Sequence, residues 1–445
     1  MAFEDAVFLY DDTPNRANTS MYVDLFPETD RPTADLIEWI TTRTDRLAVL
    51  KKVAVEPYGR IGQPHWARAP KFDVHDHVHA HEADSWSALR AKLLEVRAQP
   101  FAENRPPWEF HVIRGIDGVE GQPGRCFAVV TKFHHSFGDP SFFAPVWDAL
   151  YAADLPPAEA EPRPVSRLSV TLRELLRLPS WPVMLVADAK SSVRAQQHLS
   201  AALAESGHRP PPVERCSITA PMGLGVDADA AFFPLDRLRT AARAVGVSAN
   251  DLILGAIGSA IAEHFDDVGP DVTAFIAVST REVNPAPRNS VAGGMVRVAD
   301  DTPWPDRVRR INRDVRTERS LLSAPEALST PPRAPGFAYA WFLQRNQRSA
   351  RAREMVSAHT RISSPGRPDI TDWQLCGAQP VSRFVFVAPG ASCGLCHAVT
   401  ALGDTVAISA FVDPAQVPDL GGYLDTLRRR IDELCTPDQQ DRSFA

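Results

Sequence analysis

The sequence predicts an α/β protein made of two similar halves. Each half mixes amphipathic helices with short runs of β-branched and aromatic residues, and a proline-bounded helical stretch separates the halves. The composition, 44% hydrophobic and 23% charged over 445 residues, is that of a globular chain long enough for two or three cores. Collagen, coiled coils and wholesale disorder are excluded.

The N-terminal half is expected to span residues 1–165. Apolar residues at spacings of three and four predict amphipathic helices over 34–50 and 85–98. Two β-rich runs, WEFHVIRGI at 108–116 and RCFAVVTKFHH at 125–135, predict strands. The second strand delivers two histidines to its end.

A helical connector is expected over residues 166–214. Proline clusters at 155–165 and 209–214 bracket a stretch with helical spacing. Its arginines, among them Arg167, Arg173 and Arg177, lie beside apolar residues, as in helices that bind a membrane or lipid-droplet surface. Arginine is abundant throughout the chain, so a solvated helix between the halves is the preferred interpretation.

The C-terminal half, residues 215–445, repeats the same pattern. Residues 247–265 predict a helix capped by Ser248, and residues 423–435 predict a closing helix. Strands are predicted by TAFIAVS at 273–279, GGMVRVA at 293–299, SRFVFVA at 382–388 and DTVAISAFV at 404–412.

Charge and targeting signals exclude several classes of function. With 48 basic and 55 acidic residues the net charge is −7, so we expect no nucleic-acid partner. The first twenty residues carry acids and lack the apolar run of a secretory signal. The longest stretch without charged residues, 384–403, contains Pro389 and three glycines and predicts strand, turn and strand, not a transmembrane helix. We expect a cytoplasmic protein with reduced cysteines.

The chemistry is expected at FHHSFGDP, residues 133–140. Because successive strand side chains point to opposite faces, His135 or His134 can reach a cleft while the other points inward. Asp139 follows closely enough to accept a hydrogen bond or to hold an arginine, which would fix the geometry of a general base. A pair of satisfied histidines at a strand end is the alternative.

This motif, HHSFGD, resembles the HHxxxDG signature of the wax ester synthase/diacylglycerol acyltransferase family. That family belongs to the CoA-dependent acyltransferase superfamily, with chloramphenicol acetyltransferase and peptide-synthetase condensation domains. RPPWEFHVIRGIDG at 105–118 is similar to the family's RPLWExHxIEGL, and SANDLILGAIGSAI at 248–261 to its VNDVVLAAVAGAL. Residues 64–78 and 404–420 also resemble family blocks, and all these blocks stand in the family's order.

The resemblance implies two chloramphenicol-acetyltransferase-like domains, each a mixed sheet flanked by helices. It implies transfer of an acyl group from acyl-CoA to a hydroxyl acceptor, without an acyl-enzyme, in a channel between the domains. The acceptor would be a long-chain alcohol, a diacylglycerol or a divergent alcohol. His135 would be the general base, while His134 and Asp139 would shape the site, the aspartate paired with an arginine. No cofactor besides the co-substrate acyl-CoA is implied.

Further site residues follow from the same resemblance. Asn250 of the ND motif would face the reaction centre, where its amide could donate to the thioester oxygen. Ser136 and Gly138 would position substrate in the turn after the histidines. Three motif residues are expected to serve structure: Asp251 by capping its helix, Trp108 and Glu109 by packing their strand.

Three departures from the family pattern predict a divergent acceptor. Pro140 replaces the glycine that ends the signature, so the bend from strand to helix must differ. The FNxPxxxxR block is replaced at 220–223 and lacks its arginine, and SNVPGP is shortened at 363–366.

Two other functions stay open. A fold of this kind could bind acyl chains or lipids without catalysis. It could also acylate an amine or a specialised-metabolite hydroxyl from a carrier-protein donor, as condensation enzymes do. Release of free CoA together with ester separates these alternatives.

Two histidine or cysteine patterns invite a metal interpretation. CGLCH at 393–397 matches the c-type haem pattern, but haem attachment needs export and an axial partner, and a zinc site would need further ligands. The alternating His75, His77, His79 and His81 would place four imidazoles on one face of an extended segment, where Zn²⁺ could bind. The polar face of an edge strand is the alternative, and no physiological metal is expected.

Overall fold

The first sheet of the computed structural model belongs mainly to the N-terminal half. The structure describes residues 1–12, 18–223, 225–327, 335–366, 368–387 and 393–436. The sheet has five strands in the order β13 (Ser382–Phe386), β1 (Thr19–Pro27), β6 (Cys126–His134), β5 (Trp108–Ile116) and β4 (Val78–Glu82). Only β4 and β5 pair in parallel, and β4 is an edge strand.

Helices cover both faces of this sheet because its strands alternate large apolar side chains. On one face α2 (Thr33–Thr44) and α4 (Pro140–Tyr151) bury a cluster that includes Tyr22, Phe26 and Phe110. On the other face α3 (Trp86–Ala98), capped by Ser85, packs with Val23 and Leu25. Both helix predictions for this half are confirmed, except that residues 48–51 form a separate 3-10 turn.

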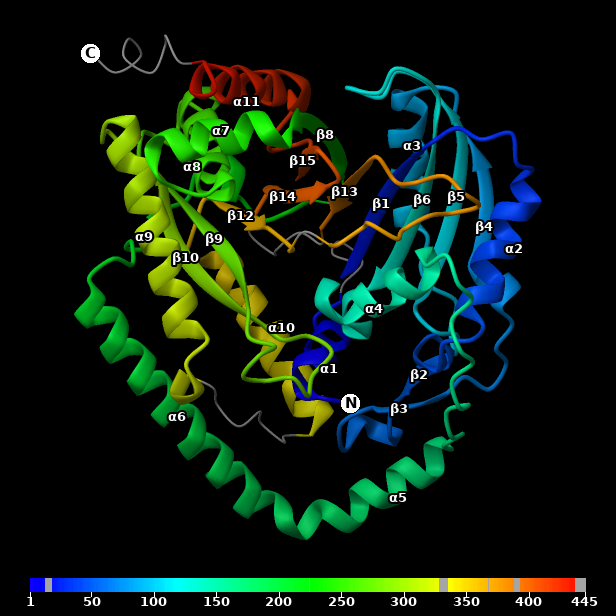
Figure 1. The fold of residues 1–445 in the computed structure, drawn as a ribbon. Helices are drawn as coiled ribbons and strands as arrows, with labels where there is room; N and C mark the ends of the chain where they lie inside the picture. The colour runs from blue at the N-terminus through cyan, green and yellow to red at the C-terminus, as the bar shows by residue number, and fades with distance from the viewer. Residues whose placement is uncertain (13–17, 224, 328–334, 367, 388–392, 437–445) are drawn as a thin grey trace.

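The second sheet has six strands and lies beside the first (Figure 1). Its order is β10 (Val291–Ala299), β9 (Val272–Ser279), β12 (Thr360–Ser363), β14 (Leu395–Leu402), β15 (Thr405–Val412) and β8 (Asp227–Pro234). β12 runs parallel to both neighbours, and the other pairs are antiparallel. A mixed sheet flanked by helices is therefore present in both halves, as the sequence predicts.

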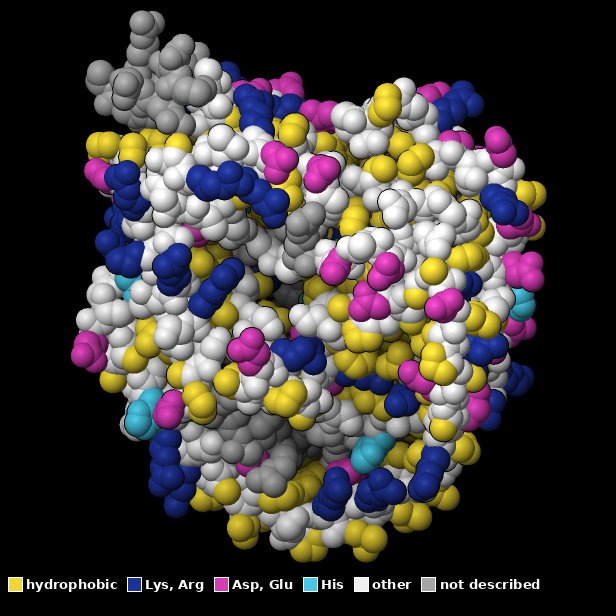
Figure 2. Space-filling model, viewed as in Figure 1, with side chains coloured by type: hydrophobic (Ala, Val, Ile, Leu, Met, Phe, Trp, Pro, Cys, Tyr) yellow, Lys and Arg dark blue, Asp and Glu magenta, His cyan; other side chains and the backbone are white. Residues whose placement is uncertain are grey.

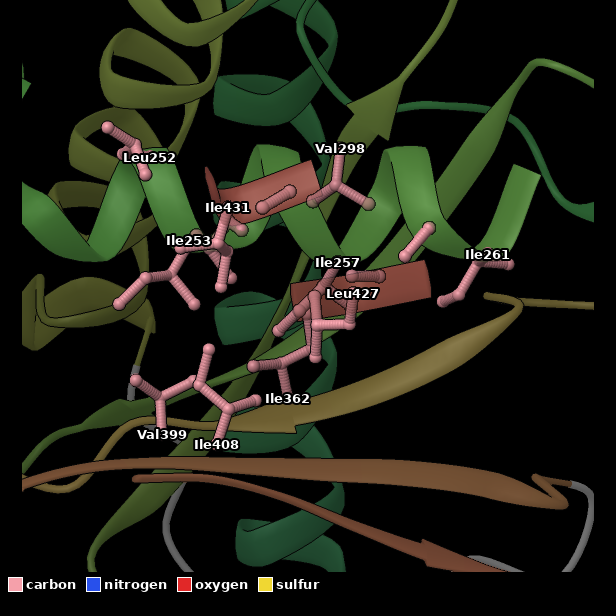
Figure 3. Packing of buried hydrophobic residues seen from close by; sticks show 14 of the residues in the cluster. Leu252, Ile253, Ile257, Ile261, Val298, Ile362, Val399, Ile408, Leu427 and Ile431 are labelled. Carbon is pink, nitrogen blue, oxygen red and sulfur yellow. The ribbon is translucent and has the colours of Figure 1, made fainter. Parts of the chain in front are cut away.

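Helices cover one face of the second sheet. They are α7 (Leu235–Val245), α8 (Ala249–His264), α9 (Trp304–Leu322) and α11 (Leu420–Leu434). Figure 3 shows Ile253, Ile257 and Ile261 of α8 turned toward the strands, with Leu427 and Ile431 of α11 beside them. The opposite face of this sheet, with Phe232 and Phe411, packs against the first sheet and α3.

The halves are joined by an exposed helical arm. It consists of α5 (Arg167–Arg177), capped by Ser166, and the long α6 (Trp181–Ser206), and it runs below the body in Figure 1. Helices are therefore present where the connector was predicted, and the choice between a solvated and a lipid-bound arm stays a prediction. Hydrophobic side chains gather along its lower edge with Lys and Arg between them (Figure 2), and the exposed ones include Leu168, Leu172, Leu176, Val183 and Val186.

One segment of the C-terminal half belongs to the first sheet. β13 comes from the C-terminal half but pairs with β1 over Met21 to Leu25, and Trp373 and Leu375 join the first core. The division into 1–165, 166–214 and 215–445 therefore assigns this returning segment to the wrong sheet. Sequence patterning did predict the strand, but it carries no information about the partner strand.

The remaining elements are short or peripheral. α1 (Phe3–Tyr10) packs against α10 (Gly336–Ala352). Two small ribbons pair β2 (Lys52–Val55) with β3 (His65–Arg68) and β7 (Val213–Glu214) with β11 (Met355–Val356). The 3-10 turns are η1 (Ala48–Lys51), η2 (Tyr58–Arg60), η3 (Val74–His77), η4 (His135–Phe137), η5 (Leu178–Ser180), η6 (Ser217–Thr219) and η7 (Pro325–Ala327).

Among the described residues, no one helix has the length and apolar character to cross a membrane, and only the sharply bent pair α7 and α8 meets that test jointly. The uncharged stretch 384–403 contributes to β13 and β14, while the part of its expected turn at 388–392 lies outside the described residues.

Candidate active site

The two histidines leave β6 in different directions. His134 is buried: its Nδ1 lies 2.7 Å from Oγ of Ser136, and its Nε2 lies 3.3 Å from a carboxylate oxygen of Asp12. His135 begins η4, is half-buried and lines a cavity. The structure therefore places the second histidine at the opening and the first inward.

The cavity lies between the two sheets and has a volume of about 530 Å³. α1 forms one wall, and the face of the second sheet that its helices leave uncovered forms another. The lining is largely apolar, with a few polar groups: Phe3, Glu4, Val7, Phe8, Asp11, Tyr22, Phe133, His135, Phe275, Ala277, Asn289, Val291, Arg361, Ile362 and Val387 are among its residues. A mostly apolar cavity with few polar groups is typical of a small-molecule site.

Two residues distant in the sequence contact the His135 ring. Its Nδ1 lies 2.8 Å from Oδ1 of Asn289, which belongs to the loop 280–290 between β9 and β10. The ring of Phe8, from α1, stacks on the imidazole at 4.1 Å between centroids and 11° between planes. No residue in the described part of the chain hydrogen-bonds to Nε2 of His135.

The surroundings of His135 favour its neutral form. Burial lowers the pKa of this imidazole below its ordinary 6.5, and the nearby His134 lowers it further. Hydrogen bonds, including the one to Asn289, and the charge of Asp139 oppose this effect without cancelling it. A ring that is unprotonated at neutral pH can act as a general base.

Asp139 holds the motif turn against the other half of the protein. This buried carboxylate accepts hydrogen bonds from Nη2 of Arg281 at 2.8 and 2.9 Å and from the backbone N–H of Ser290 at 2.8 Å. It also caps α4 by accepting from the N–H of Phe142. The pairing with an arginine that the family resemblance implied is present, and it is made by the same loop that carries Asn289.

The turn requires glycine at position 138. Its φ of 156° favours glycine, and a Cβ there would run into the ring of Phe142. Ser136 is fully buried against His134 and does not line the cavity. Its described contacts position His134, whereas a contact to substrate stays a prediction.

The structure does not bring Asn250 to this cavity. Asn250 lies in the first turn of α8, and α8 packs on the opposite face of the second sheet from the one that lines the cavity. The expected oxyanion role of this amide therefore lacks the required geometry. Asp251 caps α8 together with Ser248 and accepts a hydrogen bond from Asn312, as the structural interpretation of this residue predicts.

Trp108 and Glu109 make structural contacts at the start of β5. Trp108 is fully buried and donates through its indole N–H to the carbonyl of Leu50 at 2.7 Å. Glu109 accepts from Nζ of the buried Lys132 at 2.9 Å and lies beside His111, contacts that hold its pKa near 2 despite burial. Neither residue lines the cavity.

The four alternating histidines at 75, 77, 79 and 81 do not lie on one face of a strand. His75 and His77 lie in η3, and the latter stacks on Trp108, so only His79 and His81 share a face of β4, next to His111. The prediction of four aligned imidazoles is wrong because the chain turns at residues 74–77. Within the described residues no three His, Cys, Asp or Glu side chains are placed to hold a metal ion.

The CGLCH segment is core structure at the start of β14. Sγ atoms of the buried Cys393 and Cys396 lie 3.5 Å apart. His397 is fully buried, with Nε2 2.7 Å from the hydroxyl of Tyr423 and Nδ1 3.0 Å from that of Thr360. Both ring nitrogens are therefore engaged by protein groups.

Sequence reasoning missed Asn289, Arg281 and the residues of α1. The loop 280–290 has no periodicity, and Asn289 stands 154 positions from the histidine that it contacts. The sequence did contain a signal for α1. Phe3, Val7 and Tyr10 follow helical spacing, and the acids Glu4 and Asp5 lie in the first turn, where helices favour them.

Comparison with solved structures defines the class to which this fold belongs. The wax ester synthase/diacylglycerol acyltransferase from Marinobacter aquaeolei matches with a TM-score of 0.64 and 18% identity, over 97% of each chain. The first condensation domain of the CDA synthetase matches with a TM-score of 0.63 and 12% identity, over 99% of this chain and 95% of that one. The fold is thus the two-domain fold that acyltransferases and condensation domains share.

Sequence comparison narrows the class to a family. The family model described as wax ester synthase/diacylglycerol acyltransferase catalytic domain matches residues 1–253, and the chain belongs to this family. A Mycobacterium tuberculosis protein assigned by name to the diacylglycerol O-acyltransferases is 27% identical over 316 residues, or 65% of this chain and 64% of its own length. The chain therefore spans less than two thirds of the curated relatives that it matches first.

Proposed function

We propose that this protein is an O-acyltransferase that transfers an acyl group from acyl-CoA to a hydroxyl acceptor. Family membership supports the reaction class. One observation carries the assignment of the site: the imidazole of His135, with Nε2 unengaged by the described residues, lines a cavity between the two halves, where burial lowers its pKa. The fold alone would not separate an enzyme from a binding protein.

His135 acts as the general base in a direct transfer. Nε2 takes the proton from the acceptor hydroxyl while the acceptor oxygen attacks the thioester carbonyl carbon. The tetrahedral intermediate collapses, the carbon–sulfur bond breaks, and the imidazolium returns the proton to the departing CoA thiolate. Ester and free CoA form, and the histidine ends as it began.

The substrate class is supported by the cavity and by the relatives. The lining is apolar apart from a few polar groups, which suits an acyl chain next to a hydroxyl-bearing acceptor. A structural neighbour, a starter condensation domain of rhizomide synthetase, was solved with C8-CoA, which supports an acyl-CoA donor; it is 13% identical, with a TM-score of 0.57. We propose a long-chain alcohol, a diacylglycerol or a divergent alcohol as the acceptor.

Replacing the base tests this proposal. His135→Ala should lower turnover ~10²- to 10⁴-fold, because a positioned general base contributes that much. The assay mixes protein with a panel of acyl-CoAs and alcohols and follows free thiol and ester together. His79→Ala, a histidine on the edge strand outside the cavity, serves as the matched control and should retain turnover.

Each alternative gives a different result in the same assay. Wild-type turnover in folded His135→Ala protein would refute the general-base assignment. Retention of acyl ligand without ester from the wild-type protein would favour a binding module. Product only with amines, or only with an acyl group presented on a carrier protein, would favour condensation chemistry.

A further inference from the structure

The geometry points to α1 as a positioning element of the active site: Asp5, acting through the side-chain amide of Asn289, fixes His135 in the tautomer that leaves Nε2 free. Three residues meet here: His135 and Asn289 are 154 positions apart in the sequence, and Asn289 and Asp5 are 284 positions apart. The inference rests on the proposed function, since it assigns roles around the same general base. Neither Asp5 nor Asn289 needs to touch substrate for this role.

The orientation of the Asn289 amide follows from its neighbours. Nδ2 donates to Oδ1 of Asp5 at 2.9 Å and to the backbone carbonyl of His135 at 2.9 Å. The carboxylate of Asp5 and the carbonyl of His135 can only accept hydrogen bonds. If the amide were flipped, its oxygen would face both of these oxygens and repel them. The amide oxygen must therefore face the imidazole.

The tautomer of His135 follows in turn. Oδ1 of Asn289 lies 2.8 Å from Nδ1, and an amide oxygen can only accept a hydrogen bond. Nδ1 must carry the proton, so the lone pair of the neutral ring is on Nε2. A general base that faces the cavity through Nε2 needs this tautomer.

Asp5 is built to hold the amide in place. It is almost completely buried and accepts from the backbone N–H of Asn289 at 2.8 Å and of Arg288 at 3.3 Å, in addition to Nδ2. Burial raises the pKa of this carboxyl, while the donors from Asn289 and Arg288 oppose the rise. Its place in the first turn of α1 also favours a negative charge.

Two further contacts make α1 a rigid support. Phe8 stacks on the His135 ring and so restricts its plane. Ala6 and Tyr10, on the other side of the helix, pack with Ala340 of α10. Displacement of α1 would therefore disturb the stacking and the hydrogen-bonded chain at the same time.

Removal of the two side chains, singly and together, tests the coupling. Asp5→Ala removes one acceptor that fixes the amide, and Asn289→Ala removes the amide itself. Each single variant should lose ~10²-fold in kcat with KM little changed, because a misplaced or wrongly protonated base affects chemistry more than binding. The double variant Asp5→Ala with Asn289→Ala should lose no more than Asn289→Ala alone, because Asp5 acts on the ring through that amide.

The pH profile separates positioning from stability. In Asn289→Asp a carboxylate faces Nδ1 in place of an amide, so the acid limb of kcat/KM should move to higher pH. An unmoved acid limb in this variant, or a double alanine variant whose loss is the product of the two single losses, would overturn the inference. Asp35→Asn, an exposed acid in the first turn of α2, is the matched control and should change neither quantity.

A spectroscopic measurement keeps the inference testable if a variant does not fold. In wild-type protein with ¹⁵N-labelled histidine, the His135 signals, identified by their loss in His135→Ala, should show a proton on Nδ1 of the neutral ring. A proton on Nε2 would overturn the role of Asp5 and Asn289. Failure of the proposed function looks different, because the wild-type protein would then form no ester, or His135→Ala would retain turnover.

Discussion

The protonation state of one imidazole should set the pH range in which the protein works. Burial lowers the pKa of His135 below 6.5, so the neutral base persists under mildly acidic conditions in which an exposed histidine would already be charged. The amide of Asn289 orients the ring at Nδ1 without adding a negative charge. The partner at Nδ1 therefore raises the pKa less than a carboxylate would.

We therefore predict an acid limb of kcat/KM below the ordinary histidine range. As pH falls through the lowered pKa, protonation removes the base and the rate drops about tenfold per pH unit. The profile should be measured with one acyl-CoA and one alcohol, with substrate ionisation excluded as the cause. An acid limb at or above pH 6.5 would contradict the effect of burial on this ring.

Residues that act together within one turn could be predicted, and residues that meet through space could not. His134, His135 and Asp139 share a short motif, so the sequence placed them together at one turn, and the family resemblance implied which histidine would be the base. Asn289 and Asp5 reach the same ring from a loop and a helix far away in the chain. Asn250, by contrast, matched a motif but lies behind the second sheet.

At the scale of elements, the junction between β6 and α4 shows how a departure from the family pattern is accommodated. Pro140 stands at the first position of α4, directly after the Asp139 cap. This position needs no N–H donor, and its φ suits proline. The turn before the helix is made at Gly138, so proline at position 140 fits the start of α4, whereas a bend different from the family's stays a prediction.

Restoring the family glycine should thus affect stability more than chemistry. Pro140→Gly is predicted to lower the free energy of unfolding by about 1 kcal/mol, since glycine gives the unfolded chain more freedom. Turnover should stay within about twofold of wild type. Urea unfolding and the thiol-release assay measure the two effects, and Pro140→Ala provides an intermediate control. A large loss of turnover would instead show that the proline itself sets the active-site turn.

Element prediction succeeded where periodicity was regular and failed where the chain turned. The strands over residues 108–116 and 126–134 and the helix after Ser85 agree with their patterns to within a residue or two. The histidine row alternates like a strand, yet its first half forms η3, because Asp73 caps a turn by accepting from the N–H of His75. Aspartate favours turns, and here Asp73 starts η3 within a segment whose alternating pattern is typical of a strand.

At the scale of the molecule, a returning strand ties the two halves together. β13 supplies Arg383, whose guanidinium donates to both oxygens of Asp24 on β1 at 2.6 and 2.8 Å. The hydroxyl of Tyr151, at the end of α4, donates to the same carboxylate at 2.8 Å. All three side chains are buried. The first sheet therefore depends on a segment of the C-terminal half.

Breaking this buried pair should destabilise the whole molecule. Arg383→Met leaves the Asp24 carboxylate buried without its cation, and we predict a loss of about 3–5 kcal/mol in the free energy of unfolding. Arg237→Met breaks an exposed ion pair with Asp432 and should cost only about 0–1 kcal/mol. Urea unfolding, followed by far-UV circular dichroism and by tryptophan fluorescence, measures both. Because β13 completes the sheet that carries His135, the two signals should shift together in Arg383→Met. A separate early transition of one half, with the other unchanged, would show that the halves fold independently despite the shared strand.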